Sequence, residues 1–153
     1  MPADEAGGRP AAGQAQASAP QRPLPNLTEP DTEQFWRATG QHRLTFQVCE
    51  ACGEIVFHPR RHCTGCLSLN LQWRESAGTG TVYTYTVIRQ HGQPYFRSRL
   101  PYLVGFIDLD EGFRMMAEID AKPGSIEVGQ RVTVGWEDHD ELAIPVFRLA
   151  EAQ

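Results

Sequence analysis

The sequence lacks an apolar run long enough to span a bilayer, and its first residues lack the basic start and apolar centre of a signal peptide. We therefore expect a cytoplasmic protein without a membrane partner. Lysine is almost absent, since Lys122 is the only one, and the formal net charge at pH 7 is −5. This acidic balance disfavours broad binding to nucleic acid, which needs a basic face.

Cysteine is also scarce, and all four cysteines fall into two Cys-x-x-Cys pairs, Cys49/Cys52 and Cys63/Cys66. A chain of 153 residues can bury a core without disulfides, and in a reducing compartment such pairs are metal ligands or redox groups. A thioredoxin-like motif would need a βαβ context, and haem attachment would need a histidine after a pair. The spacing therefore predicts one structural Zn²⁺ per chain, whose four thiolates leave no coordination position for water.

The N-terminal region divides into a tail and a short helix. Residues 1–27 are rich in Ala, Gly, Pro and Gln, so we expect a disordered tail. Residues 28–42 predict a helix with Asp31 as its cap, Gln34 completing a capping box and Gly40 as a left-handed stop.

The predicted helix carries two large aromatic side chains, Phe35 and Trp36. On so short a helix they need cover, either from the protein's own domain or from a partner surface. Both interpretations stay open, and the two residues are candidates for partner binding.

The rest of the chain has the alternating pattern of β-strands. Residues 43–74, which begin with apolar residues at every second position, are predicted to form a zinc ribbon. Residues 75–153 predict five strands, at 80–90, on both sides of an Asp110-Glu111-Gly112 turn within 101–119, at 129–138 and at 145–150. Ile126 and Val128 lie where a barrel needs a plug. Five short strands favour the OB-fold barrel, and an open sandwich is the alternative. The fold class is thus mainly β.

Several of these pieces together resemble a known family. The helix with Phe35 and Trp36, the segment CEACGEIVFHPRRHCTGC, the strand GTGTVYTYTVI, the hairpin PYLVGFIDLDEGFRMMAEI and a late PVFRL are similar to the zinc-ribbon plus OB-fold proteins catalogued as domain of unknown function thirty-five. The resemblance covers residues 30–149. It implies a rubredoxin-like ribbon and a noncatalytic partner of thiolase-fold enzymes in a hetero-oligomer, which helps to bind acyl-CoA or completes a neighbouring active site. Some members belong to steroid side-chain breakdown, a branch of lipid metabolism. The family often has Pro-Pro-Arg before the second cysteine pair, whereas here His58 replaces the first proline.

Arginine and aromatic residues on two loops are the candidate ligand contacts. Guanidinium groups suit the phosphates of coenzyme A, and exposed aromatics beside arginines suit a protein interface or a ligand lid. Solvated charges, or arginines paired with an acidic partner, are the alternatives. The candidates for ligand or partner binding on these loops are Arg60, Tyr95, Phe96, Arg97 and Arg99.

Three classes of function are compatible with these residues. The first is the accessory subunit of an acyl-CoA enzyme. The second is a module for single-stranded nucleic acid, with Tyr83, Tyr85, Phe106 and Phe113 as a stacking platform. The third is a free-standing enzyme, but no histidine lies in a recognisable catalytic motif and no glycine-rich phosphate loop precedes a helix. The sequence therefore predicts a non-enzyme of the first class.

Overall fold

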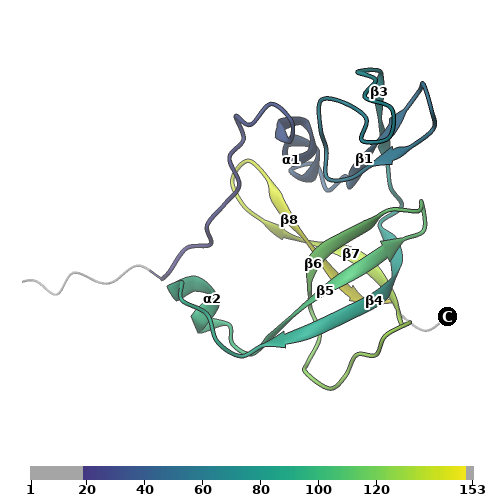
Figure 1. Cartoon of the computed structure of the whole chain (residues 1–153). Coiled ribbons are helices and arrows are strands. Elements are labelled where there is room, and N and C mark those ends of the chain that lie inside the picture. Colours follow the sequence, from purple (N-terminus) through teal and green to yellow (C-terminus); the bar gives the residue numbers. More distant parts are fainter. Residues whose placement is uncertain (1–18, 151–153) are drawn as a thin grey trace, which may run out of the picture.

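A computed structural model describes residues 19–150 as a small ribbon above a β-barrel (Figure 1). The ribbon consists of β1 (Thr45–Cys49), β2 (Ile55–Val56) and β3 (Leu71–Glu75), with β1 in the centre and antiparallel to both neighbours. Helix α1 (Glu33–Thr39) lies beside it. The predicted strand from residue 43 is therefore confirmed, and β3 is a strand that the sequence pattern did not reveal.

The barrel is closed by five strands in the order β4-β5-β6-β8-β7. All neighbouring strands are antiparallel except β6 and β8, which are parallel. This confirms the mainly β class and the five-stranded barrel, and it excludes the open sandwich. The strands are β4 (Thr79–Ile88), β5 (Tyr102–Leu109), β6 (Arg114–Ile119), β7 (Arg131–Asp138) and β8 (Ala143–Leu149).

One aromatic core joins the helix, the ribbon and the barrel. The ring of Phe113 packs against Phe46 of β1 at 5.0 Å and against Phe57 of the ribbon loop at 4.8 Å between centroids. Phe57 in turn contacts Phe35 of α1 at 5.9 Å. Because close-packed aromatic rings hold their relative geometry, the ribbon is fixed against the barrel.

The ends of α1 differ from the prediction. Thr32, not Asp31, is the residue before the helix, and it makes no side-chain cap. Gly40 has a φ of −61°, so it is not a left-handed stop; His42 takes that conformation at φ 57°. Glycine is needed at position 40 for space, since a Cβ there would lie 2.8 Å from the carbonyl oxygen of Glu141.

Two loops of the barrel also differ in part from expectation. Ile126 is buried as the predicted plug, but Val128 is 63% exposed. The loop between β4 and β5 contains a second helix, α2 (Pro94–Ser98), which the sequence pattern did not predict. Within residues 19–150, no helix is both long and apolar enough to cross a lipid bilayer.

The structure describes only the last part of the predicted tail. Residues 1–18 are not described, whereas residues 19–27 run from α2 towards α1 (Figure 1). Within this stretch the side chain of Arg22 is 9% exposed and pairs with Glu118 and Glu137. Arg22 thus packs against the barrel, although the sequence predicts a disordered tail over residues 1–27.

Candidate functional site

The four cysteines meet in the ribbon, as their spacing predicts. Their sulfur atoms all lie within 4.8 Å of one another, and Cys49–Cys66 and Cys52–Cys63 are each 3.6 Å apart. A tetrahedral zinc site with Zn–S bonds of about 2.3 Å needs sulfurs roughly 3.8 Å apart. The four sulfurs therefore fit one structural metal ion.

Backbone amides support this cluster. Gly53 permits the tight turn after the first pair, with a φ of 77°, and Leu67 takes the matching conformation after the second pair at 63°. Burial raises the pKa of the Cys49 thiol, but hydrogen bonds from the backbone N–H groups of Ala51 and Cys52 and from neighbouring thiols bring it down to about 7. At Cys49 these bonds favour the thiolate, which is the form that binds a metal. At Cys52 the backbone N–H of Glu54 lowers the pKa, but hydrogen bonds with the crowded neighbouring sulfurs raise it to about 12.

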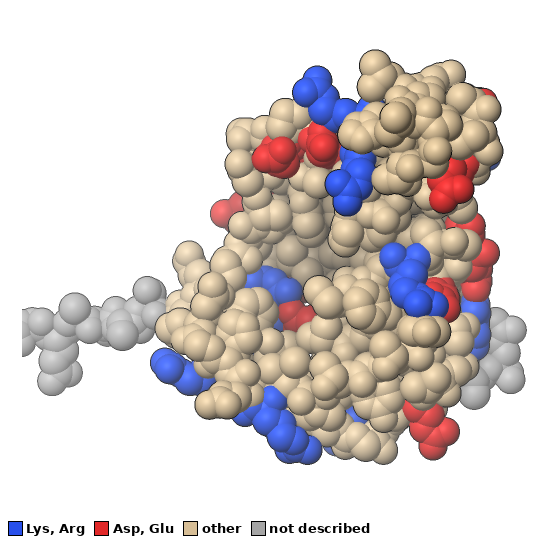
Figure 2. Space-filling view, in the orientation of Figure 1, with Lys and Arg blue, Asp and Glu red and all other residues tan. Residues whose placement is uncertain are grey.

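An apolar groove of about 310 Å³ lies between the ribbon and the barrel. Figure 2 shows the hollow between these two parts, lined mainly by uncharged residues. Small-molecule sites are typically concave and apolar, with a few polar groups that fix orientation. The residues that define this groove are Trp36, Phe57, Phe96, Tyr102, Val104 and Met116.

The inner end of the groove is polar. Arg22 and Glu118 line it there, and both side chains are about nine-tenths buried. A second, polar cavity of about 450 Å³ begins on the other side of Glu118 and includes Arg99, Trp136 and Glu137. Tyr102 and Glu118 line both spaces.

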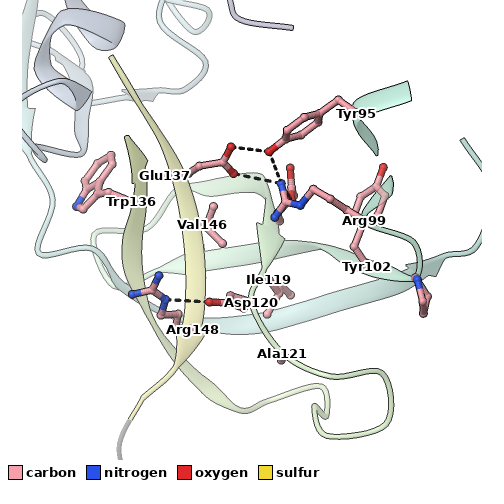
Figure 3. Close-up of a pocket in the computed structure, with 12 residues that line it drawn as sticks. Tyr95, Arg99, Tyr102, Ile119, Asp120, Ala121, Trp136, Glu137, Val146 and Arg148 are labelled. Atoms are coloured by element: carbon pink, nitrogen blue, oxygen red, sulfur yellow. Dashed lines mark hydrogen bonds and ion pairs between the residues drawn. The ribbon is translucent and has the colours of Figure 1, made fainter. Parts of the chain in front are cut away.

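Four charged side chains, which we call the charge cluster, hold this region together: Arg22, Arg99, Glu118 and Glu137. Arg99 lies 3.3 Å from Glu118. It also lies 3.2 Å from Glu137, to which the hydroxyl of Tyr95 donates at 2.6 Å (Figure 3). Burial would raise the pKa of Glu137, but the hydrogen bond from Tyr95 and the charges of Arg22 and Arg99 hold that pKa below its usual value. The two arginines neutralise the two carboxylates, so the inner end carries no net charge.

The two aromatic residues of α1 have different surroundings. Phe35 is 4% exposed and belongs to the shared core, and part of its ring also lines the groove. Trp36 is half-buried and lines the groove. Both residues remain predicted contacts for a partner or ligand, and Trp36 is the more accessible of the two.

The predicted loop residues are divided between the groove and the surface. Phe96 lines the groove, while Tyr95 and Arg99 belong to the polar cavity. Arg99 is paired with two carboxylates, which would compete with a phosphate, so its role in ligand or partner binding stays a prediction. Arg60 and Arg97 are exposed, and neither forms an ion pair with another described residue.

Sequence reasoning missed the barrel's contribution to the groove. Val104 and Met116 are on the outward faces of β5 and β6, where Met116 is 57% exposed. An apolar residue at an outward position of an alternating strand was the available signal. Arg22 carried no comparable signal, since its partners are 96 and 115 residues away.

The aromatic platform predicted for nucleic acid does not form one surface. Phe113 is buried in the core. Tyr83 is exposed, but the guanidinium of Arg114 lies 3.3 Å from its ring centroid and covers one face. Base stacking needs open ring faces beside a basic groove, so this arrangement does not favour it.

Comparisons with known proteins agree with this architecture. Residues 36–72 match the family model of the ChsH2 rubredoxin-like zinc ribbon domain, and residues 73–137 match that of the ChsH2 C-terminal OB-fold domain. A DUF35 domain-containing scaffold protein of Methanothermobacter thermautotrophicus is 33% identical over 105 residues, which cover 67% of this chain and 78% of the relative.

Two further proteins are similar over most of the chain. A probable enoyl-CoA hydratase alpha subunit of Thermomonospora curvata is 37% identical over 135 residues, which are 86% of this chain but 41% of the relative's length. A chain of the Ltp2–ChsH2(DUF35) aldolase superposes with a TM-score of 0.72 at 36% identity, covering 84% of this chain and 98% of that one. With both family models matched in order, the chain belongs to the ChsH2/DUF35 family of zinc-ribbon and OB-fold proteins.

Proposed function

We propose that this chain is a noncatalytic accessory subunit that binds a thiolase-fold enzyme, an aldolase or a thiolase, and helps to hold its acyl-CoA substrate. The single observation that carries the proposal is the likeness to the ChsH2(DUF35) chain of an aldolase, which extends over nearly all of that chain. The family resemblance points to lipid or steroid side-chain degradation as the setting.

The groove supplies the physical basis for substrate binding. Its apolar and aromatic walls favour the acyl part of an acyl-CoA, because transfer of apolar surface from water contributes about 25 cal/mol per Å². The exposed guanidinium groups of Arg60 and Arg97 are free to meet the phosphates of the nucleotide. The chain would then bind the substrate from one side while the partner enzyme supplies the reacting groups.

The described residues support a noncatalytic role. A nucleophile needs a base within hydrogen-bonding distance. Across residues 19–150, no histidine is hydrogen-bonded to a serine, threonine or cysteine side chain. The four thiols are gathered at the metal site, and none of them lines the groove.

The metal in this proposal is zinc, with a structural role. Cys49, Cys52, Cys63 and Cys66 would hold it with four thiolates, a set that zinc favours and that leaves no open position. Its binding would fold the ribbon, and the ribbon loop carries Phe57, one wall of the groove.

Reconstituted turnover tests the proposal. The chain and a thiolase-fold aldolase from the same source would be purified separately and assayed, alone and mixed, with acyl-CoA substrates. We expect no turnover by the chain alone and a higher rate in the mixture than with the enzyme alone. Turnover by the isolated chain would contradict the noncatalytic role, and an unchanged rate in the mixture would contradict the accessory role.

A further inference from the structure

Residues 19–27, which we call the strap, cross from α2 to the start of the α1 region with few attachments (Figure 1). Pro20, Pro23 and Pro25 have no N–H to donate, and residues 19–26 form no helix or strand. Among the hydrogen bonds of the described chain, those from the strap to the barrel all come from the side chain of Arg22. Leu24, the strap's first large apolar residue, is 47% exposed. The polar attachment of the described strap to the barrel is therefore one residue, Arg22, while Pro20 and Pro23 line a shallow pocket with Pro94 and Tyr95 of α2.

Arg22 is well enclosed at its attachment. Its guanidinium donates to Glu118 and, at 3.0 Å, to Glu137. It also lies 5.6 Å from the ring centroid of Tyr95 and 5.2 Å from that of Phe96. Two carboxylates and two aromatic rings thus surround one cation, which fixes its position at the inner end of the groove.

The same carboxylates have a second cation close by. Arg99 lies within 3.3 Å of both Glu118 and Glu137, so neither carboxylate is left without a positive partner when Arg22 leaves. Burying a charged pair carries a desolvation penalty that offsets much of the attraction. Release of Arg22 is therefore less unfavourable than the loss of a buried ion pair with no substitute.

Arg22 also lies where the apolar groove and the polar cavity meet. It lines the groove, while Glu118, to which it is bound, and Tyr102 line both spaces. With the guanidinium in place, the groove ends at Arg22. Without it, the space that it fills beside the rings of Tyr95 and Phe96 would join the groove.

We propose that the strap is a displaceable stopper: Arg22 closes the inner end of the groove, and an apolar ligand that fills the groove to its full depth displaces it. This inference rests on the groove being the ligand site of the proposed function. Such a ligand can bind only to chains in which Arg22 has left the groove. Its apparent affinity is therefore its intrinsic affinity multiplied by the fraction of chains in this open state.

A neutral apolar fluorescent probe, N-phenyl-1-naphthylamine, tests the stopper with the full chain alone. We expect Arg22→Ala and Arg22→Gln to bind the probe at least about fivefold more tightly than the unmodified chain, because the open fraction rises. Arg22→Lys should be intermediate, since one ammonium group cannot bridge both carboxylates as a guanidinium does. Equal affinity of the unmodified chain and these folded variants would overturn the proposal.

Three matched variants keep the result specific. Arg89→Ala removes an exposed arginine outside the charge cluster, and Leu24→Ala changes the strap but leaves Arg22 in place. Both variants should therefore bind the probe like the unmodified chain. Adding Met116→Glu, in the groove, to Arg22→Ala should abolish the gain. A gain that survives Met116→Glu would place the probe elsewhere and overturn the proposal.

Two controls distinguish a change in probe affinity from loss of folding and from failure to bind an enzyme. Metal content and thermal melting identify any Arg22 variant that has lost its fold. In that case the probe affinity of Arg22→Lys, which keeps the charge, is compared with that of the unmodified chain. The measurement uses no enzyme, so failure of the chain to join a thiolase-fold enzyme would contradict the proposed function without changing the probe affinities.

Discussion

Individual arginines pair with carboxylates all over this molecule, and their surroundings decide what each pair contributes. Arg131 binds Asp110 through two short bonds of 2.7 and 2.6 Å, but both side chains are about half exposed. Solvent-exposed pairs of this kind contribute about 0–1 kcal/mol. The charge cluster is more enclosed, so solvent and salt screen its pairs less than they screen the exposed ones.

Glu137 makes stability depend on pH. Because the pKa of Glu137 is held below its ordinary value of 4.5, the ionised form stabilises the fold above that value. This contribution disappears as pH falls through the lower pKa of the folded state. We expect Glu137→Gln to be less stable than the unmodified chain at pH 7, with the difference shrinking as the pH falls below 4.5.

Urea unfolding at a series of pH values measures this effect. Glu127→Gln, which removes an exposed glutamate outside the cluster, is the matched control and should follow the unmodified chain. A constant difference between Glu137→Gln and the unmodified chain from pH 7 to acid would show that Glu137 does not act through its charge.

Replacing the neighbours Phe35 and Trp36 by alanine should have different effects on stability and on binding. Phe35→Ala removes a ring from the shared core, so it should lower the free energy of unfolding by about 3–5 kcal/mol. Trp36→Ala opens a groove wall that is already partly in water, so the isolated chain should melt almost normally while ligand or partner binding weakens. Denaturant unfolding and a binding assay on both variants check this. Equal loss of stability in the two would place Trp36 in the core as well.

Among the helices and strands, alternation predicted most strands because inward and outward residues differ in polarity. The turn at Gly112 was also predictable, since its φ of 98° suits glycine. The ends of α1 were not, because Asp31 and Gly40 fit the usual caps in sequence while tertiary contacts set the actual ends. Helix α2 is short and lacks a side-chain cap, so little in its residues indicated a helix.

The candidate site shows the same contrast. The cysteine cluster could be read from spacing alone, since each Cys-x-x-Cys turn brings two sulfurs together locally. The groove could not, because α1, the ribbon loop and the barrel form it only after folding. Arg22 was missed for the same reason: the composition of its segment indicates disorder, and its partners lie far along the chain.

The ribbon is the element whose fold should depend on metal. We expect about one zinc per chain, and we expect Cys52→Ser to lose it and to unfold the ribbon, because metal binding supplies folding free energy there. Elemental analysis and the amide exchange of β1 and β3 measure both effects. Ser68→Ala, beside the cluster but outside the ligand set, should retain the metal. A full complement of zinc in Cys52→Ser would contradict a four-thiolate site.

For the whole molecule, the shared aromatic core matters most for function. Phe46, Phe57 and Phe113 hold the ribbon against the barrel, so the groove between them is formed before any ligand arrives. A preformed site avoids the ordering penalty that a flexible one meets on binding. The strap then becomes the variable part, as a single arginine closes one end of an otherwise fixed groove.

The proposed function requires that this chain works as part of a complex with a thiolase-fold enzyme. Size-exclusion chromatography with light scattering tests this requirement on the purified chain mixed with a thiolase-fold aldolase from its source. We expect one species whose mass equals a defined sum of both subunits, and we expect Trp36→Ala but not Arg89→Ala to weaken this complex. Two separate peaks with the masses of the free proteins, at concentrations above those used for turnover, would contradict it.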